Sequence, residues 1–331
     1  MYGHAALILG AGFSKPAGGP LLRELFTEEV VSHSEAQNES LAVLASLLQE
    51  RQSTNDASTI EIVFSEIWRE AHTGGTIGTG GESWQAADLL NELTVHLASV
   101  CGRVHVRRST TLWANYIHFF DDLYRNSKSL AVITFNYDML VEQILDDLGL
   151  RFDYSTPVGI RFENSRRRQR LSRTGGQVSV MKLHGSANWG VCRGCTKSGR
   201  APDLITAFEG AYTRTRRKRC PACESKTKFL DAGIIPPILG KAGEAQREKT
   251  VWEAARKTLS RAREIIVIGY SLPPSDTEAK SLLSEVRFLG RRPRIRIACG
   301  PGGAPSTYLD VFGNRFKDTG LYTEDLFSGW P

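Results

Sequence analysis

The first apolar run of the chain leads without interruption into a turn of small residues. His4–Leu9 has the length and the apolar content of a buried strand, and Gly10-Ala11-Gly12-Phe13-Ser14 follows it directly. A strand, a glycine turn and then a helix is an arrangement that points backbone N–H groups at a phosphate. We expect this turn either to bind phosphate or to serve only a structural role, and the residues of the turn favour neither alternative.

From about residue 21 to residue 125, apolar positions recur with helical spacing. The pattern predicts helices over Leu41–Glu50, Ile60–Ala71, Gln85–Val100 and Leu112–Tyr124. The glycine-rich run Thr73–Gly81 lies between two of these segments and predicts a flexible link.

Strands and helices alternate again after residue 129. The expected strands are Leu130–Thr134, Val178–Leu183, Glu264–Ile268 and Arg294–Ala298, and the expected helices are Met139–Leu148, Ala245–Arg261 and Asp276–Phe288. Such alternation is typical of a doubly wound, mostly parallel, Rossmann-like α/β sheet with right-handed crossovers.

Two C-x-x-C pairs stand out among the six cysteines. Cys192 and Cys195 form the first pair, and Cys220 and Cys223 form the second, with 24 residues between Cys195 and Cys220. Four thiolates at this spacing predict a tetrahedral zinc site, and a closed set of four sulfurs leaves no position for an activated water. We therefore expect the zinc to be structural.

The expected domain organisation follows from these patterns. Residues 1–331 form one domain, which is interrupted by a helical insertion over residues 24–128 and by a small zinc-ribbon module over residues 190–230. Both insertions fall between strands, where a sheet tolerates added chain.

Composition narrows the class of protein. The chain has 331 residues, of which 41% are hydrophobic and 24% charged, and it shows neither a signal-like N-terminus nor a long apolar run. We expect a cytoplasmic protein without a membrane partner.

The net charge of +6 is concentrated in the Arg-rich runs Arg166–Arg173 and Arg214–Arg219. We favour solvated loops over a nucleic-acid site for these runs, because they lack interleaved aromatic residues.

Polar residues follow three of the predicted strands at their carboxyl ends. His184 and Gly185 come after the strand that ends at Leu183, Thr134-Phe135-Asn136-Tyr137-Asp138 follows the strand Leu130–Thr134, and Gly269-Tyr270-Ser271 follows Ile268. Ligand crevices of parallel sheets open at this edge, and histidine accepts protons near neutral pH. His184 is thus a candidate catalytic residue. The alternatives are a hydrogen-bonded core histidine, and helix capping by Asn136 or Asp138.

These motifs, in this order, resemble those of the sirtuin superfamily. The sirtuin pattern G-A-G-x-S matches Gly10–Ser14, and the arginine that follows it in sirtuins matches Arg23. The pattern T-Q-N-I-D matches Thr134–Asp138, the H-G pair matches His184 and Gly185, and G-T-S matches Gly269–Ser271. The two cysteine pairs lie where sirtuins have a zinc ribbon.

The resemblance implies a site for NAD. By it, Gly10, Ala11, Gly12, Ser14 and Arg23 would contact the NAD phosphates, and Asp138 would bind the nicotinamide carboxamide. Asn136 and His184 would be the catalytic residues at the nicotinamide ribose, whereas Gly269 and Ser271 would line the adenosine end. Cys192, Cys195, Cys220 and Cys223 would hold structural zinc.

Departures from the sirtuin pattern bear on the reaction. Leu21-Leu22 replaces Asp-Phe before Arg23, Phe135 replaces Gln, and Ile234–Lys241 replaces the substrate-side segment that usually ends in F-G-E. The variants T-F-N-Y-D at Thr134–Asp138 and G-Y-S-L-P at Gly269–Pro273, together with the helical insertion, are more similar to bacterial sirtuin-like proteins that hydrolyse NAD in anti-phage defence.

We therefore expect an NAD glycohydrolase (NADase) that cleaves NAD to nicotinamide and ADP-ribose. It would work as a homo-oligomer or with an associated defence protein. The alternatives are an NAD-dependent protein deacylase or ADP-ribosyltransferase, and a non-catalytic sensor of NAD or ADP-ribose.

Overall fold

A seven-stranded parallel sheet forms the centre of the molecule. The computed structural model of the chain describes residues 2–31, 34, 36, 38–51, 57–79, 81–156, 177–192, 205–207, 210–212, 230–239, 249–273, 276–302 and 305–326. The strand order is β12-β11-β10-β1-β4-β6-β5. The strands span Tyr2–Leu9 (β1), Ser127–Thr134 (β4), Phe152–Asp153 (β5), Val178–Lys182 (β6), Glu264–Ile268 (β10), Arg294–Ala298 (β11) and Lys317–Asp318 (β12).

The chain builds this sheet outward from β1 in two directions. The strands β4, β5 and β6 lie on one side of β1, and the later strands β10, β11 and β12 lie on the other side. The order reverses beside β1, and a doubly wound sheet opens its ligand crevice at such a reversal, outside the carboxyl ends of the strands. The expectation of a doubly wound, mostly parallel α/β sheet is confirmed.

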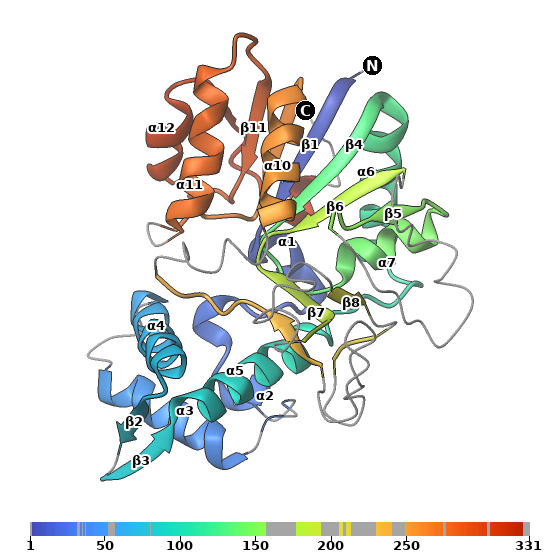
Figure 1. The fold of residues 1–331 in the computed structure, drawn as a ribbon. Helices are drawn as coiled ribbons and strands as arrows, with labels where there is room; N and C mark the ends of the chain where they lie inside the picture. Colours follow the sequence, from blue (N-terminus) through green and yellow to red (C-terminus); the bar gives the residue numbers. More distant parts are fainter. Residues whose placement is uncertain are drawn as a thin grey trace.

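Helices cover both faces of the sheet (Figure 1). One face carries α6 (Thr111–Asn126) and α7 (Leu140–Asp147), and the other carries α10 (Lys249–Arg261), α11 (Thr277–Ser284), the 3-10 helix η5 (Glu285–Phe288) and α12 (Thr307–Phe312). Parallel strands that are buried on both faces have near-continuous apolar sequences, and all five residues of β10 are buried.

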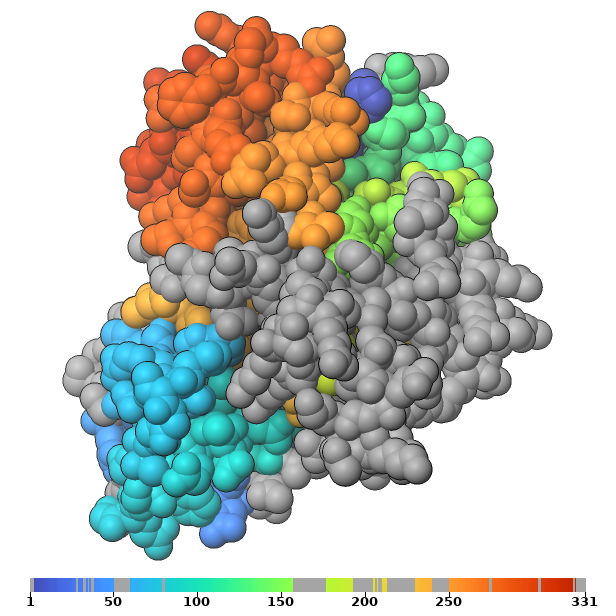
Figure 2. All heavy atoms as spheres, in the orientation of Figure 1, coloured from blue at the N-terminus to red at the C-terminus, as the bar shows by residue number. Residues whose placement is uncertain are grey.

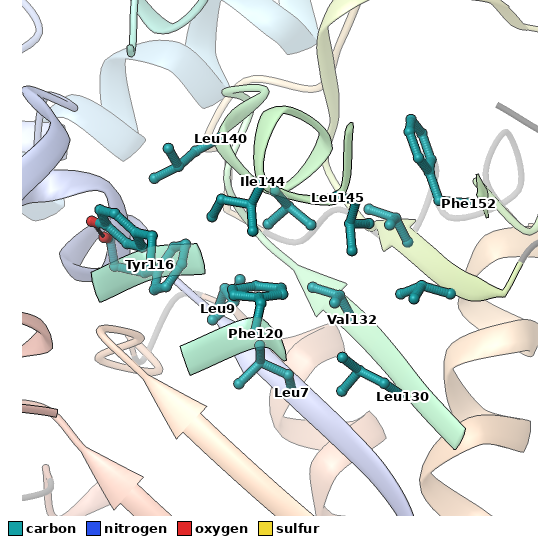
Figure 3. Close-up of a cluster of buried hydrophobic side chains, with 14 of the residues drawn as sticks. Leu7, Leu9, Tyr116, Phe120, Leu130, Val132, Leu140, Ile144, Leu145 and Phe152 are labelled. Carbon is teal, nitrogen blue, oxygen red and sulfur yellow. Dashed lines mark hydrogen bonds between the residues drawn. The ribbon is translucent and has the colours of Figure 1, made fainter. Parts of the chain in front are cut away.

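The two hydrophobic cores follow from the alternation of side chains along the strands. Leu7 and Leu9 of β1 pack in one core with residues of α6 and α7, whereas Ala6 and Ile8 pack in the other core with α10 and α11. Figure 3 shows the first core, where Tyr116 and Phe120 of α6 lie against the strands. Burial of this apolar surface fixes the sheet between its helices.

A further group of helices lies at the carboxyl-end side of the sheet (Figure 1). It comprises α2 (Glu28–Val31), α3 (Asn38–Arg51), α4 (Ala57–Thr73) and α5 (Ala86–Cys101). Residues such as Leu44, Phe64 and Leu93 form its own core. Helix α6 belongs to the same expected insertion but packs on the sheet. The insertion limits of 24 and 128 stay a prediction.

The expected flexible link over Thr73–Gly81 is wrong. The chain forms an antiparallel hairpin of β2 (Thr76–Thr79) and β3 (Glu82–Gln85), in which Ile77 pairs with Trp84. Thr and Ile favour extended backbone, Ile77 is buried, and Gly81 has a φ of 83° at the turn. Gly81 of this run therefore serves the turn of a hairpin.

A small antiparallel sheet begins immediately after His184. Its strands are β7 (Gly185–Val191), β8 (Ile205–Ala207) and β9 (Asp231–Ile234), in the order β8-β7-β9. The sequence pattern did not predict these strands. The sheet joins the helical group, since Ala187 and Ile234 lie in the same core as α5. On the face drawn in Figure 2, the segment that follows β9 lies between the α3–α5 group and the β10–α12 half.

The other predicted elements agree with the structure to within a few residues. The expected helix Asp276–Phe288 divides into α11 and η5, and residues 245–248 of the expected helix Ala245–Arg261 lie outside the described residues. The short elements β5, β12, α12 and α13 (Thr323–Leu326) were not predicted. Within the described residues, no helix is both long enough and apolar enough to cross a membrane.

Candidate functional site

The register of the sheet brings the predicted site segments to one edge. Leu9, Thr134 and Lys182 pair across β1, β4 and β6, and Leu9 also pairs with Ile268 of β10. The ladder continues one residue further, because Phe135 N donates to Leu9 O at 3.0 Å and Leu183 N donates to Thr134 O at 3.0 Å. Asn136 and His184 are therefore the second residues beyond the paired row, at the ends of two adjacent strands.

The turn after β1 packs tightly against the turn after β10. The turn contains the four-residue helix α1 (Ala11–Ser14), which the 3-10 helix η1 (Lys15–Ala17) follows. Gly12 N donates to Gly269 O at 2.9 Å, and Gly269 has a φ of 62°. A Cβ on Gly10 would lie 2.5 Å from Tyr270 Cα, and one on Gly269 would lie 2.2 Å from Phe13 N. Contact between the two turns accounts for these glycines, which favours the structural alternative for this turn.

Ser14, Asn136 and Asp138 meet in one hydrogen-bonded cluster. The Ser14 hydroxyl donates to Asp138 Oδ2 at 2.6 Å, and Asn136 Nδ2 donates to Ser14 Oγ at 3.0 Å and to Gly10 O at 2.8 Å. Both N–H donors of Asn136 are thus engaged, which leaves its Oδ1 as an acceptor. The structure brings together three residues that the sequence predicted from two separate motifs.

Asp138 has two roles in this cluster. Its Oδ2 accepts the Ser14 bond, and its Oδ1 accepts a bond from the Leu140 N–H at the start of α7, at 3.0 Å. The N-cap of α7 is Met139, so Asp138 contacts the start of the helix from one residue before the cap position, and the capping alternative is not confirmed. Burial raises the pKa of the Asp138 carboxyl, while the positive charge of Lys182 and the Ser14 hydroxyl act in the opposite direction.

A buried polar network lies next to Asp138, and the sequence analysis missed it. Lys182 is 1% exposed, and its Nζ donates to the backbone oxygen of Asp138 and, at 3.0 Å, to Glu142 Oε1. Tyr154 OH also donates to Glu142 Oε1, at 3.1 Å, and Asn188 Nδ2 donates to Tyr154 OH at 3.3 Å. The signal in the sequence was a lysine at the end of an otherwise apolar strand, a position that requires a buried partner.

His184 belongs to a second cluster, which faces α10 and α11. Its Nε2 lies 3.6 Å from Asp276 Oδ2, and its ring packs edge-on against Phe135 with a centroid distance of 5.2 Å. The Phe135 ring in turn stacks on Tyr270 at 4.0 Å, and Tyr270 OH donates to Asp276 Oδ2 at 2.7 Å. Because Phe135 and Asn136 are consecutive, the two clusters are joined at the end of β4.

Asp276 is a residue of this site that the sequence analysis did not identify. It directly precedes α11, and the sequence pattern counted it as the first residue of a helix. An acidic residue at the start of a helix normally indicates helix capping. Asp276 comes close to His184 only because the sheet places β10, which precedes Asp276, near β6, which precedes His184.

Arg23 and Ser271 are exposed. Arg23 lies in the 3-10 helix η2 (Leu22–Glu24), next to Glu24, which pairs with Lys15 at 2.6 Å. Ser271 lies between Tyr270 and Leu272, and the backbone of Leu272 has a φ of 49° although the residue is fully buried. Ala11 is partly buried as the first residue of α1. Within the part of the chain that the structure describes, neither Arg23 nor Ser271 takes part in the two clusters.

The zinc prediction concerns mostly residues outside the described ranges. Cys192 is buried directly after β7, whereas Cys195, Cys220 and Cys223 are not described. The described residues contain no group of three or more His, Cys, Asp or Glu side chains that could hold a metal ion. The Arg-rich runs Arg166–Arg173 and Arg214–Arg219 also lie outside the described residues.

Comparison with known proteins finds similarity in solved structures alone. No protein-family model and no curated protein matches the chain. A Sir2 homolog in complex with NAD is 15% identical and has a TM-score of 0.43, with 98% of this chain and 86% of that chain covered. A structure titled as the basis for sirtuin substrate affinity is 14% identical, with a TM-score of 0.39 and coverage of 98% and 90%. A complex of Sir2, a p53 peptide and NAD+ has the same identity, TM-score and coverage. At TM-scores below 0.5 this likeness carries no argument about ligand or reaction.

Proposed function

We propose that this protein is an NAD glycohydrolase. The observation that carries the proposal is the position of Asn136 and His184 at the same level on adjacent strand ends, with Asn136 bonded to the Ser14–Asp138 pair. These groups supply a base, an amide acceptor and a hydrogen-bonded carboxyl beside the reversal of strand order, where such sheets bind nucleotides.

The chemical character of these groups fits a nicotinamide riboside moiety. The Asp138 carboxyl, whose pKa burial raises, lies next to the Ser14 hydroxyl and the Asn136 amide, and this set of groups suits a neutral carboxamide. The stacked and buried aromatic rings of Phe135 and Tyr270 make the same edge of the sheet partly apolar. The glycine turn is explained by its contact with Gly269, so a phosphate role for the turn rests on the motif resemblance alone.

In the proposed reaction, a water oxygen attacks the anomeric carbon of the nicotinamide ribose. The bond between that carbon and the nicotinamide nitrogen breaks, and its electron pair neutralises the pyridinium ring. His184 accepts the proton that the water loses, directly or through a ribose hydroxyl, and Oδ1 of Asn136 orients the attacking oxygen. The products are nicotinamide, ADP-ribose and one proton, so atoms and charge balance.

Product analysis of purified full-length protein tests the proposal. Incubation with NAD in the absence of peptide should release nicotinamide and ADP-ribose, and His184→Ala and Asn136→Ala should each reduce the rate by roughly 100-fold or more. His118→Ala is the matched control, because His118 is exposed on α6 and should leave the rate unchanged. Turnover that persists in both site variants would eliminate the assignment.

The same chromatography separates the alternative reactions. A deacylase or ADP-ribosyltransferase would consume NAD only in step with an acceptor, such as an acetyl-lysine peptide. A sensor would bind NAD in a calorimeter and would show no turnover with or without peptide.

We also propose, from the motif resemblance alone, a role in bacterial anti-phage defence as a homo-oligomer or with an associated defence protein. Infection assays and light scattering test these two points.

A further inference from the structure

Asp276 stands in the N-cap position of α11 but does not use its side chain as a cap. Asp is among the preferred N-cap residues, because its carboxylate accepts backbone N–H bonds from the first turn of a helix. The Asp276 side chain makes no such capping bond. It turns inward, where its Oδ2 accepts the Tyr270 hydroxyl and lies 3.6 Å from His184 Nε2.

This orientation places a negative charge inside the protein. Asp276 is 4% exposed and His184 is 6% exposed. A buried carboxylate is unfavourable unless hydrogen bonds or an opposite charge compensate it. Burial and the charge of Asp276 both raise the pKa of the Tyr270 phenol, so Tyr270 stays a neutral donor to Asp276. A protonated His184 would provide the compensating charge.

We propose that Asp276 is the positioning residue for His184: it orients the imidazole and stabilises the imidazolium that forms when His184 accepts a proton. The inference rests on the proposed function, because it assigns a partner to the catalytic base of that reaction. An acidic partner that holds a catalytic imidazole in one orientation and stabilises its charged form is an effective way to strengthen a base.

The remaining neighbours of His184 support a fixed ring. Phe135 packs edge-on against the imidazole, Trp252 of α10 lies 6.5 Å away between ring centroids, and the backbone oxygen of His184 accepts the Ile235 N–H at 3.0 Å. Among the described residues, the titratable groups around the pair include Tyr270, Tyr308 of α12 and Cys299, which both donate to Tyr270 O, and Glu61 of α4, whose charge acts on Tyr270.

The test compares the pH dependence of NAD turnover in the wild type and in Asp276→Asn, which keeps the shape and removes the charge. The acidic limb of the kcat profile should move to lower pH by roughly one unit, because His184 loses the charge that favours its protonated form. The plateau should fall on the order of tenfold or more, while KM changes much less. Asp276→Glu should restore part of both effects.

A loss of stability alone would not produce this pattern. Thr110→Ala is the matched control, because Thr110 caps α6 through a bond from Trp113 N at 3.2 Å, far along the chain from the site. This control should lower the melting temperature and leave the acidic limb in place. If Asp276→Asn behaves in the same way as Thr110→Ala, the inference is wrong.

A measurement that needs no turnover separates this inference from the proposed function. The imidazole resonances of His184, assigned by their loss in His184→Gln, are titrated by NMR in the wild type and in Asp276→Asn. A lower midpoint in the variant supports the pairing even if NAD is not consumed, in which case the proposed function fails and the pairing stands. An unchanged midpoint overturns the pairing, whether or not the enzyme hydrolyses NAD.

Discussion

Ser14 and Asp138 are 124 residues apart in the chain, and the Ser14 hydroxyl donates a 2.6 Å hydrogen bond to Asp138 Oδ2. The bond joins the turn after β1 to the segment after β4, two strands that are parallel neighbours. Both partners are buried, at 2% and 8% exposure. The pair therefore depends on the sheet being complete, and it couples the stability of the fold to the geometry of the candidate site.

The Asp138 carboxyl should make stability depend on pH. Burial raises its pKa above that of an ordinary aspartate, so the folded state holds this proton more tightly than the unfolded state does. Its contribution is fully present below the unfolded pKa and is lost as pH rises through the folded pKa. Asp138→Asn should therefore gain stability relative to the wild type as the pH rises from about 4 upward, as measured by urea unfolding. A stability difference that is constant over this range would contradict the assignment.

Gly269→Ala should destabilise the protein by more than about 2 kcal/mol. The added Cβ would lie 2.2 Å from Phe13 N on a backbone with a φ of 62°. Gly290→Ala is the matched control, because a Cβ there meets nothing within 4 Å, and its effect should stay within about 0.5 kcal/mol. Denaturant unfolding of both variants measures the difference, and equal effects would refute the close contact between the turns.

Lys182→Met should lower the free energy of unfolding by about 3–5 kcal/mol, because Glu142 would keep a buried negative charge without the cation that compensates it. The double variant Lys182→Met with Glu142→Gln should recover part of this loss, since no net charge then remains to be compensated. The exposed ion pair Arg256–Glu285 offers a comparison, and Arg256→Met should cost less than about 1 kcal/mol. A double-mutant cycle that gives no coupling between residues 182 and 142 would disprove the buried pair.

Removal of zinc should unfold part of the protein, and it should reduce NAD turnover only through that loss of structure. We predict that the purified protein carries zinc in a fixed ratio to the chain, that Cys195→Ser lowers the zinc content, and that Cys101→Ala, outside the C-x-x-C pairs, leaves the content unchanged. Chelation should expose the region of residues 190–230 to protease, and NAD turnover should fall only together with this loss of structure. Inhibition by a chelator with an intact proteolysis pattern would mean that the zinc is not structural.

The parts of the fold that could be predicted from the sequence are those in which local pattern and tertiary burial agree. The strands β1 and β10 contain short apolar runs that are buried on both faces, so their character was visible without knowledge of their neighbours. Ser14, Asn136 and Asp138 come shortly after the carboxyl ends of strands. Their proximity could be predicted, because the carboxyl ends of parallel strands share one edge of the sheet.

The missed elements depend on contacts between distant segments. The strands β7 and β9 contain small and polar residues, and they form a sheet only because Gly185 pairs with Ile234, far away in the sequence. Asp276 looked like the start of a helix, since its partner His184 comes from another part of the sheet. Lys182 was counted as an ordinary residue of the strand Val178–Leu183, because its partners lie in α7 and in the segment before it.

The central place of β1 has a consequence for how this protein is made. On the ribosome β1 (Tyr2–Leu9) emerges long before one of its two partners, β10, which begins at Glu264. Until β10 has been made, one flank of β1 therefore has bare amide and carbonyl groups that other nascent chains could pair with. Chaperones that shield such flanks should raise the yield of folded protein during synthesis.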